Sequence, residues 1–232
     1  MSAVPEFDQF VDAYESDLNQ ALTASGEDQD YFARGRVAFL AHCLRKLEET
    51  PRSAMDYGCG IGGTAPLLQE FLGASHVLGL DPSERSLERA QKQHGCGAIS
   101  FQTIARHEPA NDVDLVYCNG VFHHIPVKDR SSAMKYIYRS LRPGGLFALW
   151  ENNPWNPGTR YVMAKCVFDR DAVTLSAPQS KRLLRRAGFA ILRTDFLFYF
   201  PRALKALRPL ESGLLRLPLG AQFQVLCRKP SL

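Results

Sequence analysis

The sequence has few cysteines, and their spacing fits neither a metal site nor a disulfide framework. Six cysteines occur among 232 residues, with no Cys-x-x-Cys pair and none beside histidine at zinc-finger spacing. The lack of such pairs argues against zinc-ribbon and disulfide-scaffold proteins. We therefore predict free thiols, a reducing compartment and no bound metal.

Long apolar segments are also missing. No run of about 18 uncharged apolar residues occurs, so we expect no transmembrane helix. The start of the chain contains Glu6 and Asp8 and no basic segment, which does not match a secretory signal peptide. The expected location is the cytoplasm.

The chain carries little excess charge of either sign. Its 28 Lys and Arg residues against 24 Asp and Glu residues give a net charge of +4. This sum neither suggests nor excludes nucleic-acid binding, because the distribution of charge matters more. With 45% hydrophobic and 22% charged residues, the composition is typical of a globular protein. We predict a single domain over residues 1–232, long enough to bury a substantial core.

Two helical patterns precede any strand pattern. Apolar residues recur every three or four positions from Phe7 to Leu22, and again from Val37 to Leu47. That spacing places them on one face of a helix. We predict that residues 1–50 form an N-terminal helical cap.

Residues 51–151 alternate between short apolar strands and helical segments. The predicted strands cover 53–57, 76–80, 98–102, 113–118 and 146–151. The predicted helices cover 64–72, 83–93 and 128–141, and a turn at 143–145 precedes the fifth strand. This alternation is typical of an α/β protein with a parallel sheet covered by helices on both faces.

Residues 152–232 are expected on the substrate side. They comprise a loop or lid with a short helix over 152–178, a helix over 180–187, and strands over 189–200 and 222–228. Between those strands, leucines interleave with arginine and lysine over 201–220. We favour a core-packing extension there; a cover over the cleft, a dimer contact and a membrane-surface helix remain alternatives.

A glycine loop between the first strand and the next helix is the most informative segment. Gly58, Gly60 and Gly63 have the G-x-G-x-x-G spacing, and Asp81 follows Gly60 by 21 residues at the end of the second strand. This arrangement formally matches a dinucleotide-binding fingerprint.

Asp56, two residues before the first glycine, discriminates between ligands. A dinucleotide places its pyrophosphate on the helix N-terminus, where a neighbouring carboxylate would repel it. A ligand with an ammonium group and no phosphate, such as S-adenosylmethionine, would instead be attracted to Asp56. Asp81 would then accept hydrogen bonds from ribose hydroxyls. The alternative is a tight turn in which Asp56 only caps the helix.

With these motifs the sequence resembles the class I S-adenosylmethionine-dependent methyltransferases. The residues that carry the resemblance are Asp56–Gly63, Gly79–Ser83, Asp114–Val116, Asn119–Ile125, Leu141–Gly145 and Leu183–Phe189. They span residues 53 to about 190. The resemblance implies a Rossmann-like, doubly wound sheet of seven strands in the order 3-2-1-4-5-7-6, with strand 7 antiparallel.

The resemblance also implies which residues bind the cofactor. Asp56, Gly58 and Gly60 would line its methionine part, with Asn119 beneath the sulfonium. The full set implied is Arg36, Asp56, Tyr57, Gly58, Cys59, Gly60, Asp81, Pro82, Ile104, Ala105, Asn119, Gly120 and Val121. Arg36, or else Arg34, would supply a cation from the cap. Ile104 and Ala105 match loosely, because an aspartate usual near the adenine is absent.

Two adjacent histidines, His123 and His124, follow the fourth strand. Ligands bind at the carboxyl ends of the strands in such sheets, so both should lie near the reaction centre. Histidine exchanges protons near neutral pH, which suits removal of a hydroxyl proton. We predict that one of them, preferably His124, is a general base. The alternative is a structural pair that bonds to the loop.

Amide, acid and indole groups follow the fifth strand. Glu151, Asn152, Asn153 and Trp155 are our candidates for substrate contact. Alternatively, the asparagines satisfy backbone groups of a turn.

The predicted function is methyl transfer from S-adenosylmethionine to a small-molecule acceptor, with oxygen slightly preferred over nitrogen or carbon. A non-catalytic cofactor-binding or partner-regulating module is the alternative, and a nicotinamide dehydrogenase is disfavoured by Asp56. Base methylation of nucleic acids is disfavoured, because Asn119 is followed by Gly-Val-Phe rather than by the Pro-Pro-Tyr/Phe common in such enzymes. No nucleic-acid partner is expected.

Overall fold

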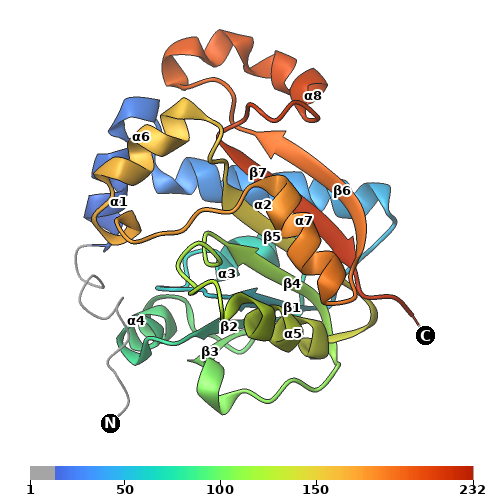
Figure 1. The fold of residues 1–232 in the computed structure, drawn as a ribbon. Helices are drawn as coiled ribbons and strands as arrows, with labels where there is room; N and C mark the ends of the chain where they lie inside the picture. The colour runs from blue at the N-terminus through green and yellow to red at the C-terminus, as the bar shows by residue number, and fades with distance from the viewer. Residues whose placement is uncertain (1–13, 232) are drawn as a thin grey trace.

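A computed structural model describes residues 14–231 and shows a single seven-stranded sheet (Figure 1). The strands are β1 Ser53–Tyr57, β2 His76–Asp81, β3 Ile99–Thr103, β4 Val113–Asn119, β5 Leu141–Asn152, β6 Ala190–Leu197 and β7 Gln222–Arg228. Their order is β3-β2-β1-β4-β5-β7-β6, and β7 runs antiparallel to both β5 and β6. The predicted order and the antiparallel seventh strand are confirmed.

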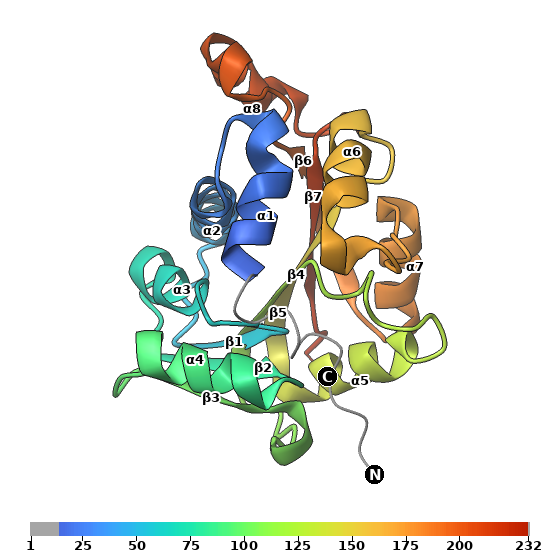
Figure 2. The ribbon, with the colours of Figure 1, turned by 90° about the vertical axis from the view of Figure 1, so that its left-hand side faces the viewer.

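Helices cover both faces of the sheet (Figure 2). The helices are α1 Tyr14–Leu22, α2 Gln29–Lys46, α3 Ala65–Leu72, α4 Glu84–His94, α5 Arg130–Ser140, α6 Pro157–Lys165, α7 Ala177–Arg186 and α8 Glu211–Leu214. One core forms where α2 and α3 pack on the sheet, and another where α5 and α7 pack on the opposite face. The central strands are buried on both sides, as expected when crossover helices cover both faces.

The beginning of β5 differs from the prediction. The expected turn at 143–145 lies inside the strand, which starts at Leu141, paired with Val113 of β4. The regular register resumes with Leu115 opposite Leu146. Gly144, with φ of 79°, donates its N–H to the carbonyl oxygen of Lys229, the residue after β7. The intervening residues therefore bulge but remain attached to the sheet.

The predicted N-terminal cap is divided: α2 packs on a face of the sheet, and α1 lies beyond the carboxyl ends of the strands. Asp28 caps α2 by accepting a hydrogen bond from the Tyr31 N–H, and α1 packs against α6 (Figures 1 and 2). Phe7, one of the apolar residues used to predict the first helix, lies outside the described residues. The helix α6 follows the carboxyl end of β5, so its contact with α1 encloses space above the strand ends.

Residues 201–220 add little to the core, although Leu215 packs against it. They form a 3-10 helix, η5, over Arg202–Leu210, followed by α8, and neither contains a buried residue. Five leucines of the segment are largely exposed: Leu204, Leu207, Leu210, Leu217 and Leu219. The predicted core-packing extension is therefore confirmed only at Leu215, and most leucines of the segment do not pack on the core. Within residues 14–231, no helix is both long and apolar enough to cross a membrane.

Candidate functional site

A cavity of about 1020 Å³ lies at the carboxyl ends of the strands. The carboxyl ends of β1 to β6 contribute to its wall, with Gly58 and Gly60 after β1 and Asp81 at the end of β2. Neighbouring parallel strands end at the same edge, so these loops converge although they are far apart in sequence. Ten predicted cofactor residues line it: Arg36, Gly58, Gly60, Asp81, Pro82, Ile104, Ala105, Asn119, Gly120 and Val121.

The glycine loop turns tightly beneath this cavity. Gly58 and Gly60 have φ of 77° and 53°, a region that other residues adopt only with strain. A Cβ atom on Gly58 would lie 2.3 Å from Val121 Cγ2, whereas a Cβ atom on Gly60 would meet nothing within 4 Å. Gly58 is thus required by packing, and Gly60 leaves the space above the loop open.

Asp81 is held in place by two backbone N–H groups. Its Oδ2 atom accepts from the Gly60 N–H at 2.9 Å, and its Oδ1 atom accepts from the Ser83 N–H at 2.9 Å. The residue is 8% exposed and lies in the cavity wall. Each carboxylate oxygen can accept more than one hydrogen bond. Asp81 can therefore hold the loop and a hydroxyl donor at the same time.

Three predicted cofactor residues do not reach the cavity wall: Asp56, Tyr57 and Cys59. Asp56 is 3% exposed, and burial and the nearby Asp81 raise its pKa to about 7, against the opposing effect of Arg36. Its carboxyl group can act on a ligand in the cavity only through its charge.

Arg36 supplies a cation to the wall. Its Nε and Nη1 atoms donate to Tyr117 Oη at 3.1 Å and Gln222 Oε1 at 3.0 Å. The other candidate, Arg34, is half-exposed and pairs with Asp30 on the surface. Between the two arginines of α2, the geometry thus favours Arg36.

The two histidines differ in their surroundings. His123 is buried, with Nδ1 2.6 Å from Glu151 Oε2 and Nε2 3.5 Å from Asp169 Oδ1. Burial lowers the pKa of His123, but Glu151 and Asp169 outweigh it and raise the value to about 10. The His124 side chain is 18% exposed, and its Nε2 atom lies 3.3 Å from the same Asp169 oxygen. Both histidines line the cavity: His123 is held as a cation, and His124 beside it is the more exposed of the two.

Asp169 is a site residue that the sequence interpretation missed. It belongs to the 3-10 helix η4 (Val167–Asp169) in the lid and lines the cavity. Burial raises its pKa, but His123 and His124 outweigh that effect and lower the value to about 2. No motif surrounds it in the sequence; only its place in the predicted lid could have suggested it.

The same three side chains have the composition of a metal-binding group. The ligand atoms of His123, His124 and Asp169 all lie within 4.8 Å of one another. Glu151 bonds the far nitrogen of His123, as second-shell carboxylates do in metal sites. The prediction of no bound metal considered only the spacing of cysteines along the sequence. Such spacing does not reveal side chains, such as these three, that come together only in the folded chain.

The substrate candidates after β5 are only partly near the cavity. Asn152 lines it, whereas Glu151, Asn153 and Trp155 do not. Glu151 is 1% exposed and bonds His123 and the Phe122 N–H. The geometry therefore does not support direct substrate contact by Glu151, Asn153 or Trp155, because their side chains are buried elsewhere or turned outward.

Asn153 serves the fold instead. It is fully buried, and its Nδ2 atom donates to Pro218 O at 3.0 Å and Gly220 O at 2.8 Å. Asn153→Ala is expected to lower the free energy of unfolding by about 2 kcal/mol, because the carbonyls of Pro218 and Gly220 lose their donor. Urea denaturation measures this. Trp155→Ala, at a 51% exposed site, is the control and should change stability by less than about 0.5 kcal/mol. Equal stability of the two variants would contradict the structural role of Asn153.

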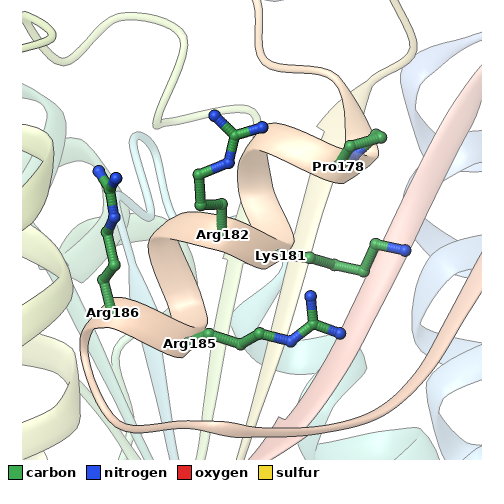
Figure 3. A pocket seen from close by; sticks show the side chains of 5 residues that line it. All are labelled: Pro178, Lys181, Arg182, Arg185 and Arg186. Carbon is green, nitrogen blue, oxygen red and sulfur yellow. The ribbon is translucent and has the colours of Figure 1, made fainter.

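A second hollow of about 460 Å³ lies on the outer side of α7 (Figure 3). Its lining consists of Pro178 and four cationic side chains, Lys181, Arg182, Arg185 and Arg186. None of these residues belongs to the wall of the large cavity. The two hollows are therefore separate features.

Comparison with known proteins finds methyltransferases. A family model described as a methyltransferase domain matches residues 54–145. Trans-aconitate 2-methyltransferase of Methylobacterium radiotolerans is 33% identical over 135 residues, covering 58% of this chain and 49% of the relative. Sterol 24-C-methyltransferase of Aspergillus fumigatus is 28% identical over 193 residues, covering 75% and 49%. The chain spans about half the length of these curated relatives.

Solved structures share the fold at low identity. An S-adenosylmethionine-dependent methyltransferase from Mesorhizobium loti has a TM-score of 0.59 at 24% identity, covering 80% of this chain and 95% of that one. A possible histamine N-methyltransferase from Thermotoga maritima has a TM-score of 0.67 at 21% identity, covering 96% and 98%. Together with the family match and the sheet order, these likenesses confirm the predicted resemblance. Residues 54–145 thus match a methyltransferase domain, and the whole sheet has the fold of S-adenosylmethionine-dependent methyltransferases.

Proposed function

We propose that this protein transfers a methyl group from S-adenosylmethionine to an oxygen atom of a small-molecule acceptor. The observation that carries the proposal is a single cavity with the Gly58–Gly60 loop and Asp81 in one part of its wall and His124 in another. We take residues 1–232 as one methyltransferase domain, because the strands between Ser53 and Arg228 form one sheet.

The cofactor end of the cavity fits the family's cofactor. The open space above Gly60 accommodates a ligand close to the backbone, and the two oxygens of Asp81 suit a ribose diol. Pro82, Ile104 and Ala105 would flank the adenine, with Asn119 to Val121 beneath the methionine part. Arg36 would face its carboxylate. Its ammonium group would favour the ionised form of Asp56, whose pKa is raised by burial and by Asp81.

S-adenosylmethionine supplies an electrophilic methyl group on a sulfonium. The protein's main contribution is then to hold the acceptor oxygen in line with that methyl group and to exclude water. When a hydroxyl oxygen gains a methyl group, it loses its proton. We propose that His124 accepts this proton, and that His123, held as a cation by Glu151 and Asp169, positions Asp169 and His124.

The relatives act on different acceptors, so their names do not identify this one. One is named for trans-aconitate and another for a sterol carbon. The alternative function is a non-catalytic module that binds the cofactor without turnover. Incubation with the methyl-labelled cofactor and a metabolite extract separates the two. Label transferred to a small molecule supports the enzyme, and cofactor binding without any transfer supports the module.

Asp81→Ala is expected to weaken binding of S-adenosylhomocysteine roughly 10- to 100-fold, because a charge-assisted contact to the ribose is lost. Isothermal titration calorimetry measures the affinity. Asp112→Ala is the matched control, since Asp112 is exposed and outside the cavity wall. Unchanged affinity in folded Asp81→Ala would remove Asp81 from the cofactor site.

A further inference from the structure

The wall on the acceptor side of the cavity is apolar. It is built by the segments that cover the strand ends: α1, α2, α6 with η4, and the residues after β6. We call six of its residues the acceptor wall: Leu22, Phe32, Val162, Met163, Phe168 and Phe200. None carries a charge. An acceptor seated against them buries hydrocarbon rather than ionic groups.

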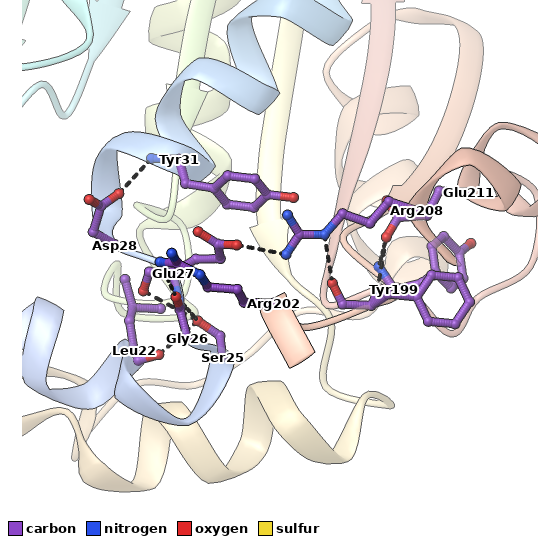
Figure 4. A network of polar contacts seen from close by, with 11 residues as sticks. Leu22, Ser25, Gly26, Glu27, Asp28, Tyr31, Tyr199, Arg202, Arg208 and Glu211 are labelled. Carbon is purple, nitrogen blue, oxygen red and sulfur yellow. Dashed lines mark hydrogen bonds and ion pairs between the residues drawn. The ribbon is translucent and has the colours of Figure 1, made fainter. Parts of the chain in front are cut away.

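The arginines of the cavity wall already have partners. Arg208 Nη2 lies 2.8 Å from Glu27 Oε1, and Arg208 Nε donates to Phe200 O at 3.2 Å (Figure 4). The guanidinium carbon also lies 4.7 Å from the ring centroid of Tyr31. Arg36 is the other arginine of this wall among residues 14–231. It donates hydrogen bonds to Tyr117 Oη and to the amide oxygen of Gln222. A carboxylate of the acceptor would therefore compete with Glu27 for Arg208.

Negative charge faces the cavity beside the histidines. Asp169 lies in the wall, and Glu27 and Asp81 contribute two further carboxylates. Arg36, Arg208 and the protonated His123 in the same wall offset these three carboxylates, so the site has no surplus of positive charge to hold a polyanionic acceptor. The wall therefore disfavours polyanionic acceptors, although it offers His124 to a single protic group.

We infer that the acceptor is an apolar molecule with one hydroxyl group, and not a polycarboxylate. This inference rests on the proposed function, since it assigns the remainder of the cavity to the acceptor. Its support comes from outside the matched family region, because all six acceptor-wall residues lie outside residues 54–145. The match to the family model therefore does not determine which residues form the acceptor wall.

The test uses the full chain loaded with S-adenosylhomocysteine and two probes, naphthol and tricarballylate. Calorimetry first measures the S-adenosylhomocysteine affinity and then that of each probe. We expect naphthol to bind and tricarballylate to bind at least about tenfold more weakly, because only the first matches an apolar wall. Failure of S-adenosylhomocysteine to bind would refute the proposed function itself. Normal loading, with tricarballylate binding as tightly as naphthol or with no naphthol binding, would overturn only the acceptor class.

A pair of lysine variants on α6 locates the probe. Val162→Lys places a cation in the acceptor wall and is expected to weaken naphthol binding about tenfold or more. Ala164→Lys places the same charge at an exposed position of the same helix, outside the wall, and should leave naphthol binding unchanged. S-adenosylhomocysteine affinity should be unchanged in both variants, which shows that they fold. Equal effects of the two lysines on naphthol would overturn the assignment of this wall to the acceptor.

Discussion

Replacing His124 with alanine is expected to lower turnover about 100- to 10,000-fold, the usual contribution of a positioned general base. Both histidines line the cavity, and the geometry favours His124 over His123 as the proposed base. His123 is enclosed by Glu151 and Asp169, which raise its pKa to about 10 and keep it protonated at neutral pH. His124 lies in the cavity wall with an 18% exposed side chain.

The measurement is the rate of methyl transfer to the acceptor identified by the labelled-cofactor screen. Affinity for S-adenosylhomocysteine should change little, because His124 is proposed to act on the acceptor. His76→Ala is the control, since His76 is exposed at the opposite end of β2 and should keep full activity. A near wild-type rate for folded His124→Ala would make the pair structural and leave transfer to positioning alone.

The strands of the sheet were predictable because the sequence patterns that indicate them are local or repeated. The first four strands are short apolar segments bounded by turns, and the predicted limits of β1 and β7 agree with the structure at both ends. The order of the strands came from the resemblance, since pairing between distant strands leaves no local pattern. The start of β5 was missed because Pro143, Gly144 and Gly145 are typical of a turn, and here they form a bulge that remains paired.

The candidate site was predictable where a motif carries it. The glycine loop, Asp81 and the histidines were found because strand ends and ligand positions coincide in this kind of sheet. Asp169 and the acceptor wall were not found, because they lie on covering segments without a motif. Asn153 was misjudged for the opposite reason: a polar residue at a strand end looks functional, yet here it holds the backbone at Pro218 and Gly220.

The same limit applies to the leucines after β6. Leucine at helical spacing predicts a buried face, and residues 201–220 were expected to pack on the core for that reason. Periodicity shows only that one face is apolar; it does not show that anything covers that face. Here Leu207 and Leu210 are exposed, whereas Arg208 between them points to Glu27 and the cavity (Figure 4). Part of the segment therefore covers the cleft.

Gly60→Val is expected to abolish detectable binding of S-adenosylhomocysteine while the protein remains folded. The loop itself leaves room for a side chain, because a Cβ atom on Gly60 would meet nothing within 4 Å. The added methyl groups would occupy the cavity itself, and the φ of 53° would be strained in a β-branched residue.

Gly63→Val is the matched control for that substitution. Gly63 belongs to the same loop, also has open space around its Cβ position, and lies outside both the positive-φ region and the cavity wall. If occupancy of the cavity causes the loss, calorimetry should show weak or no binding for Gly60→Val and near wild-type affinity for Gly63→Val. Thermal unfolding of both variants reports whether the loop remains folded. Normal affinity in Gly60→Val would mean that the loop is only a turn, and that the cofactor binds elsewhere.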